Sequence, residues 1–293
     1  MNLQMKAIVF SLISMIGFGL ETAIVKKYSE ILGPIRMIFY RNLVIVLITF
    51  IALLFFIKSI NFDINYILLG FIISAASYGG IFFFMKALSK GKVGIVSPIV
   101  GTRGLIASFI GLVIFREVIT TGQLFSILIA FTGIILSTIN FSDFKKSNIF
   151  SFKSGVPFAI LAAIFWGMTF PLFSIPSGIL GAFLFSFILE LTVLFMATMQ
   201  TIIIKIPIDI KKDFSRYSFA IITIGSLGSL GSIFMNLGYA TGQISIVSTI
   251  LSCVPLVAVI YGRLVYRELM STKQYLAAAL MIAGIAGLSY FHR

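Results

Sequence analysis

Apolar stretches of about twenty residues follow one another along the whole chain, and short polar segments such as KKYSE and KSINFDIN separate them. An α-helix needs about 20 apolar residues to cross the hydrocarbon core of a bilayer. The pattern therefore predicts an all-α integral membrane protein with ten transmembrane helices. We place them at residues 5–25, 32–57, 65–86, 93–115, 121–141, 154–174, 178–204, 217–239, 243–265 and 273–291. The boundary between the sixth and seventh helices, at 175–178, carries no charge.

The amino-acid composition indicates whether the chain folds in water or in a membrane. Of 293 residues, 59% are hydrophobic and 11% are charged, far from the usage of soluble domains. Backbone groups in lipid must bond internally, which helices achieve within each segment. The first apolar stretch is not followed by a small-residue cleavage site, so we interpret it as a retained span. The lipid bilayer is therefore the expected surroundings of this chain.

The chain contains an internal duplication. Residues 91–133 and 242–284 align at a constant offset of 151, with 13 of 43 positions identical. The matches include Arg116-Glu117 with Arg267-Glu268, followed in register by Thr, Gln and Gly. Such self-similarity marks a repeat architecture, here with units 1–145 and 146–293 of five helices each. Because five is odd, the second unit enters the membrane from the opposite face, which predicts inverted repeats with a binding site between them near the midplane.

Four charged residues fall deep within the predicted helices: Arg103, Glu190, Arg41 and Glu21. Charges at such depth are costly and usually face a cavity or a partner. One interpretation makes Arg103 and Arg41 anchors for a carboxylate or other anion, since a guanidinium offers two parallel hydrogen bonds. Glu190 or Glu21 would then meet an ammonium group or carry a coupling proton. The alternative is structural: an internal Arg103–Glu190 ion pair, with Arg41 serving the architecture.

Other residues point to the site less directly. Trp166, Tyr78 and Tyr239 are either cavity aromatics or ordinary packing. Pro98 and Pro255 lie in corresponding helices and predict kinks, which free backbone groups that can line a cavity.

Enzyme, metal and nucleic-acid functions find no support. The single histidine is His292, beside the end of the chain, and the single cysteine is Cys253, inside an apolar helix. No metal-ligand spacing, cofactor motif or nucleophile with a base is present, so we expect neither an enzyme nor a cofactor. The net charge of +13 comes largely from the segments between helices and needs no nucleic-acid partner. Four Lys and Arg on the side of the termini against fifteen on the other predict external termini.

Several features together resemble a known family. They are Phe165-Trp166-Gly167 with its counterpart Gly17-Phe18-Gly19, the arginine seven positions after Pro34, and the helix endings Phe115-Arg116-Glu117 and Tyr266-Arg267-Glu268. The chain resembles the EamA-type permeases of the drug/metabolite transporter superfamily over essentially its whole length. Copy one departs from the pattern, with Gly104 where copy two has Pro255. The resemblance implies ten helices in inverted repeats and the export or exchange of small metabolites, often amino acids. It also implies termini in the cytoplasm, whereas the count of Lys and Arg residues predicts external termini.

These observations predict a secondary transporter of the plasma membrane that moves a small polar metabolite, an amino acid or organic anion, by alternating access. We expect a monomer or homodimer. The alternatives are a carrier for organic cations and a flippase for a lipid-linked headgroup. An open lateral groove lined by Arg36, Arg41 and Lys92 would favour the flippase, and a closed midplane cavity around Arg103 and Glu190 a soluble metabolite.

Overall fold

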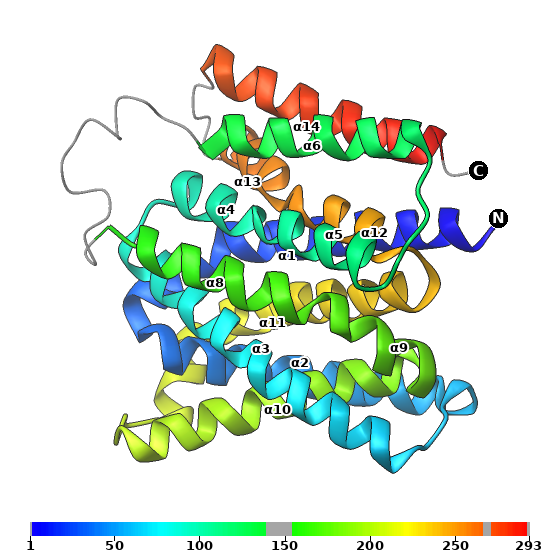
Figure 1. The fold of residues 1–293 in the computed structure, drawn as a ribbon. Coiled ribbons are helices and arrows are strands. Elements are labelled where there is room, and N and C mark those ends of the chain that lie inside the picture. Colours follow the sequence, from blue (N-terminus) through cyan, green and yellow to red (C-terminus); the bar gives the residue numbers. More distant parts are fainter. Residues whose placement is uncertain (1, 139–153, 266–270, 292–293) are drawn as a thin grey trace.

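The computed structural model describes residues 2–138, 154–265 and 271–291, and within these parts the chain forms helices and no strands (Figure 1). The helices are α1 (Leu3–Leu32), α2 (Pro34–Phe55), α3 (Ile64–Lys90), α4 (Val93–Gly101), α5 (Arg103–Val113), α6 (Thr121–Thr138), α8 (Val156–Thr169), α9 (Ser174–Leu180), α10 (Ala182–Ile203), α11 (Ile210–Thr241), α12 (Ile244–Ser252), α13 (Val254–Val265) and α14 (Thr272–Tyr290). Short 3₁₀ turns occupy Ile57–Ser59 and Pro171–Phe173. The predicted helical fold class is confirmed.

Among the described residues, each predicted apolar stretch is largely helical, although the number of membrane crossings is given less directly. Eight segments of the described chain are long and apolar enough to cross a bilayer. The helix at Thr121–Ser137 is apolar but shorter. The protein is therefore a multi-pass helical membrane protein.

Two helices extend well beyond the predicted apolar stretches. Helix α1 continues to Leu32 instead of ending at residue 25, and α11 begins at Ile210 instead of 217. The end of α1 and the start of α11 are set by local helix-stop and helix-start residues, and not by the positions where the sequence changes from apolar to polar. Gly33, with φ of 82°, and Pro34 end the first helix. The side chain of Asp209 accepts the backbone N–H of Lys212 and so caps the start of α11.

The predicted boundary at 175–178 was wrong, because those residues lie inside α9. Pro171 tightens the chain into a 3₁₀ turn, and the next helix begins after Gly181. Gly181 adopts φ of 89°, a conformation that favours glycine. It stands 148 residues after Gly33, which ends the first helix of copy one in the same way.

The two copies exchange their first helices. Helix α1 of copy one packs along α11 of copy two, while α8 of copy two packs along α3 of copy one. The aromatic side chains at the two crossings correspond: Phe18 covers Gly231, and Trp166 covers Gly80. In Figure 1 the two termini lie at the same end of the bundle, and α8 starts from the opposite end to α1. Helices α6 and α14, the last of each copy, lie side by side.

The fourth helix of each copy is broken at the same place. Helix α4 gives way to α5 at Thr102, and α12 gives way to α13 at Cys253, 151 residues later. The two broken helices cross near the breaks, where a Cβ on Gly104 would lie 2.8 Å from Cβ of Ser252. Glycine in copy one, where copy two has Pro255, therefore permits this close approach.

Three predictions lie outside the described residues: the domain boundary at 145–146, the Arg267-Glu268 pair and His292.

Candidate functional site

Two adjacent cavities lie at the centre of the bundle. They share a wall made by Phe18, Arg41, Ile81, Trp166 and Phe170. The first extends to both helix breaks and is lined by Arg103 and Val254, and the second extends to Glu190 on α10. Each has a volume of about 50 Å³. Since roughly 10–15 Å³ on this measure holds one water, each has room for a few waters.

All four deep charges of the sequence reach this region. Arg103, Glu190, Arg41 and Glu21 are 8%, 5%, 4% and 5% exposed, and each lines one or both of the cavities. They come from α5, α10, α2 and α1, four helices widely separated in sequence. The fold therefore gathers the few intramembrane charges at one place.

Arg103 is the first residue of α5, directly after the break. Its guanidinium carbon lies 5.0 Å from the ring centroids of both Trp166 and Phe170, within cation–π range. Its Nη2 donates to the carbonyl oxygen of Leu251 at 3.4 Å, and its Nε has no hydrogen-bond partner among the described residues. No carboxylate of the described chain forms an ion pair with it, so the considered Arg103–Glu190 pair is not formed.

The carbonyl that Arg103 reaches is free because of Pro255. A proline cannot donate the helical hydrogen bond to the carbonyl four residues earlier, which here is that of Leu251. The proline of copy two thus supplies a backbone acceptor to the arginine of copy one. Pro98 lies inside α4, four residues before the other break. Broken helices at corresponding positions are a hallmark of binding sites in inverted-repeat carriers.

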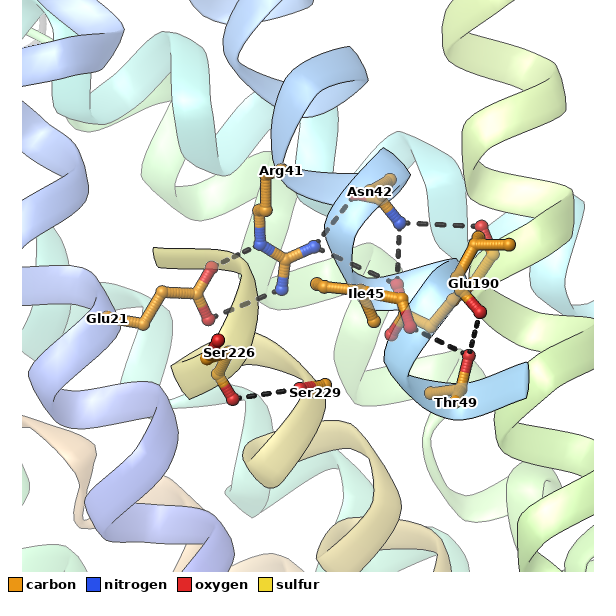
Figure 2. Close-up of polar contacts among 9 residues, drawn as sticks. Glu21, Arg41, Asn42, Ile45, Thr49, Glu190, Ser226 and Ser229 are labelled. Carbon is orange, nitrogen blue, oxygen red and sulfur yellow. Dashed lines mark hydrogen bonds and ion pairs between the residues drawn. The ribbon is translucent and has the colours of Figure 1, made fainter. Parts of the chain in front are cut away.

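Arg41 organises a second polar group on the other side of the site (Figure 2). Its Nε and Nη2 donate to the two carboxylate oxygens of Glu21, the Nη2 bond being 3.3 Å long. Its Nη1 donates to Oδ1 of Asn42 at 2.9 Å and lies 3.8 Å from Oε2 of Glu190. We call Glu21, Arg41, Asn42 and Glu190 the acidic cluster, because it holds two carboxylates and one guanidinium.

Asn42 is the member of this cluster that the sequence analysis missed. Its Nδ2 donates to Oε2 of Glu190 at 2.6 Å, while its Oδ1 accepts from Arg41. The amide orientation follows from these neighbours, because the flipped amide would direct its NH₂ at the guanidinium. One signal was available: Asn42 and Glu190 stand 148 residues apart, the offset that relates the early helices of the two copies.

The aromatic candidates divide into two groups. Trp166 lines both cavities and packs against Phe84 and Phe170, which the sequence analysis did not select. Tyr78 instead donates to Oε1 of Gln200, and the hydroxyl of Tyr239 is 2.9 Å from that of Ser248. Neither tyrosine lines the two cavities described above. Their bonds join α3 to α10 and α11 to α12, as packing contacts do.

Contacts between the copies also occur at the two ends of the bundle. At the end of the bundle where the termini lie, the carboxylate of Glu117 accepts two backbone N–H groups. They belong to Ile244 and to Ser245, the latter at 2.9 Å, so that Glu117 caps the start of α12. At the opposite end, Asp213 of α11 accepts from Arg36 and, at 2.6 Å, from the Tyr40 hydroxyl. Glu117 therefore has a structural partner within the protein, which its position at a helix end did not reveal.

Comparison with known proteins agrees with this architecture. The model of the EamA-like transporter family matches residues 5–139 and 153–290, one match for each copy. A solved structure titled only as the crystal structure of a protein is 13% identical in sequence, with a TM-score of 0.73 over 97% of this chain and 96% of that one. At this identity the likeness establishes the fold alone. The comparison with curated proteins found no match.

Proposed function

The chain belongs to the EamA-like transporter family, and we propose that it is a secondary transporter for a small metabolite carrying a carboxylate, an amino acid or an organic anion. The transporter would act in the plasma membrane, with ten helices in two inverted repeats. Transport would proceed by alternating access, with the two central cavities opening in turn to each side.

One observation carries this proposal: Arg103 is a deeply buried cation with unfilled hydrogen-bonding capacity. Its Nε lacks a partner among the described residues, and its contact with Leu251 is long at 3.4 Å. A buried charge without a counter-ion is costly, so the site favours an anionic ligand. A carboxylate fits the fork of the guanidinium, and Trp166 and Phe170 hold that fork in place.

The opposite wall supports a small amphipathic ligand. The acidic cluster contains one more carboxylate than guanidinium, whereas Arg103 has no carboxylate partner among the described residues, which supports a site with one anion-binding and one cation-binding end. Phe18, Ile81 and Trp166 provide apolar surface that lines both cavities. An amino acid presents a carboxylate, an ammonium group and an apolar side chain, which matches this arrangement. An organic anion would use Arg103 alone.

The contacts between copies support alternating access. The breaks at Thr102 and Cys253 are equivalent, so either side of the site has the same kind of half-helix. Glu117 ties the copies together at one end, and Arg36 with Asp213 ties them at the other. Opening one end while the other stays tied would expose the site to one side at a time.

A thermal-shift screen of the purified protein tests the substrate class. Amino acids, organic anions, nucleosides and organic cations would be added singly, and a ligand of the folded state raises the melting temperature by mass action. We expect stabilisation by carboxylate compounds in the wild-type protein and its loss in Arg103→Ala. Stabilisation by organic cations alone, unaffected in Arg103→Ala, would contradict the proposal and move the site to the acidic cluster.

The flippase alternative receives less support from the placement of the basic residues. It required a lateral groove lined by Arg36, Arg41 and Lys92. Arg36 is paired with Asp213, Arg41 is buried with Glu21, and neither Arg36 nor Lys92 lines the two central cavities. Counterflow of a soluble hit from the screen in proteoliposomes would separate the two, because a headgroup flippase would not exchange it.

A further inference from the structure

The acidic cluster contains more negatively than positively charged side chains. Two carboxylates, Glu21 and Glu190, face one guanidinium, Arg41, and all three side chains are almost fully buried. With every group in its ordinary ionised form the cluster would carry a net negative charge inside the membrane. Because such a charge is costly there, the cluster needs one further positive charge.

Glu21 is the carboxylate that neutralises Arg41. Both its oxygens accept from the guanidinium, through Nε and Nη2, which is the side-by-side geometry of a strong charge-assisted pair. Glu190 is placed differently. Its Oε2 lies 3.8 Å from Nη1 of Arg41, without a hydrogen bond, because that nitrogen donates to Asn42. Among the described residues, Glu190 therefore has only the shared Arg41 and no counter-ion of its own.

The elements packed against Glu190 offer it no other cation among the described residues. Helix α2 presents Arg41 and the neutral amide of Asn42. Helix α3 presents Tyr78, which is bonded to Gln200. Helix α11 presents Met235 on the wall that it shares with Glu190, and Glu21 of α1 contacts Arg41. Arg103, on α5, lines the neighbouring cavity among aromatic rings.

We propose that Glu190 is a proton-binding site, which binds one proton when no cationic group of a ligand occupies the cavity beside it and releases that proton at alkaline pH. Its Oε2 accepts from Asn42 at 2.6 Å, which leaves Oε1 as the atom that carries the hydrogen. On release, the Oε1–H bond breaks, its electron pair stays on the carboxylate, and the proton passes to water in the cavity. The role of this site in coupling transport to protons rests on the proposed function, whereas proton binding itself does not.

Infrared difference spectroscopy of the full-length purified protein tests proton binding directly, with the proton as the probe. Spectra would be compared between acidic and alkaline samples, from about pH 5 to about pH 9, a range that covers buried carboxyl groups. We expect a carboxylic-acid carbonyl band in the wild-type protein that disappears at high pH. Glu190→Gln should lack this band. The matched control is Glu30→Gln, which removes a more exposed glutamate paired with Lys26 and should retain it.

A second variant tests the charge count. In Glu21→Gln one carboxylate remains beside Arg41, so Glu190 becomes its counter-ion and the band should also vanish. Glu190→Asp keeps an ionisable group and should keep a band at an altered midpoint, which guards against misfolding of the glutamine variant. A band unchanged in Glu190→Gln, or absent from the wild-type protein at every pH, would overturn the proposal. Persistence in Glu21→Gln would do so too.

Transport assays distinguish failure of this inference from failure of the proposed function. With a hit from the thermal-shift screen, the wild-type protein should show counterflow and also accumulation driven by a pH gradient, and Glu190→Gln should lose the accumulation driven by the pH gradient. Absence of counterflow in the wild-type protein would instead count against the proposed function and leave the infrared result standing.

Discussion

Asn42 and Glu190 occupy equivalent positions in the two copies, and their side chains are hydrogen-bonded to each other, with Nδ2 2.6 Å from Oε2. Their helices, α2 and α10, pack against each other. Equivalent residues of two related units meet only where the axis relating the units passes. A pseudo-twofold axis relating the copies would therefore run beside the acidic cluster, where copy two has a carboxylate and copy one has an amide. A symmetric framework thus carries an asymmetric site.

Substitution of Arg103 should abolish transport of carboxylate substrates with little effect on folding. A hydrogen bond to a charged group is worth about 1.5–3 kcal/mol, so substrate affinity should fall at least about tenfold in Arg103→Lys. Lysine retains the charge but loses the fork. Binding would be measured by titration of the hit from the screen, and folding by thermal unfolding.

Arg216→Lys is the matched control, because Arg216 is exposed on α11 and lies over Tyr217. It should leave binding and transport unchanged. Wild-type affinity in Arg103→Lys would show that the bidentate geometry is not used, and wild-type affinity in Arg103→Ala would remove this residue from the site.

Substitution of Asn42 should destabilise the protein in a manner that depends on pH. In Asn42→Ala, Glu190 loses a donor and Arg41 an acceptor, at a cost of about 1–3 kcal/mol for a buried group left unsatisfied. In Asn42→Asp, a third carboxylate joins the single guanidinium. Carboxylates side by side favour protonation, so the aspartate variant should be stable at low pH and lose stability as pH rises. Thermal unfolding across pH checks both, and equal pH dependence in Asn42→Asp and the wild-type protein would contradict the argument.

Removal of the Glu117 cap should weaken the contact between the two copies at the end of the bundle where the termini lie. Its carboxylate accepts two backbone N–H groups at the start of α12, where the helix dipole also favours negative charge. Loss of a cap typically costs about 0.5–2 kcal/mol, so Glu117→Ala should lower thermal stability by that order. The exposed neighbour in Arg116→Lys serves as the control. Unaltered stability in Glu117→Ala would show that water replaces the cap without loss.

The sequence predicted the helices and the deep charges well, because hydrophobic length and the cost of buried charge are local properties. It did not predict which charges meet. Arg41 lies inside α2 and Arg103 directly after the break between α4 and α5, and only the rotation of each helix in the bundle directs one to Glu190 and the other to Trp166. That rotation depends on packing such as Phe18 over Gly231, which no single stretch encodes. Gly181 could have been found, because it repeats Gly33 at an offset of 148.

Inverted topology predicts that equivalent loops face opposite sides of the membrane. Lys58 follows α2, and Lys211 lies at the start of α11, after the equivalent helix α10; both are exposed. Single cysteines at these two positions should react with a membrane-impermeant maleimide from opposite sides in uniformly oriented vesicles. The native Cys253 is fully buried and should stay unlabelled, which serves as the background control. Labelling of both from one side would rule out inverted repeats.

Two arguments about the orientation of the protein in the membrane disagree. The excess of Lys and Arg on the side away from the termini predicts external termini, whereas family resemblance implies cytoplasmic ones. Many of those lysines lie at helix ends, as Lys90 does at the end of α3, where a long side chain reaches either interface. They therefore constrain orientation weakly, and we expect the termini in the cytoplasm. A reporter active only in the cytoplasm, fused after Arg293, should be active, and the same reporter inserted after Lys211 should be silent. The reverse pair of results would support the charge count, and activity at both sites would contradict the odd number of membrane crossings predicted between Lys211 and Arg293.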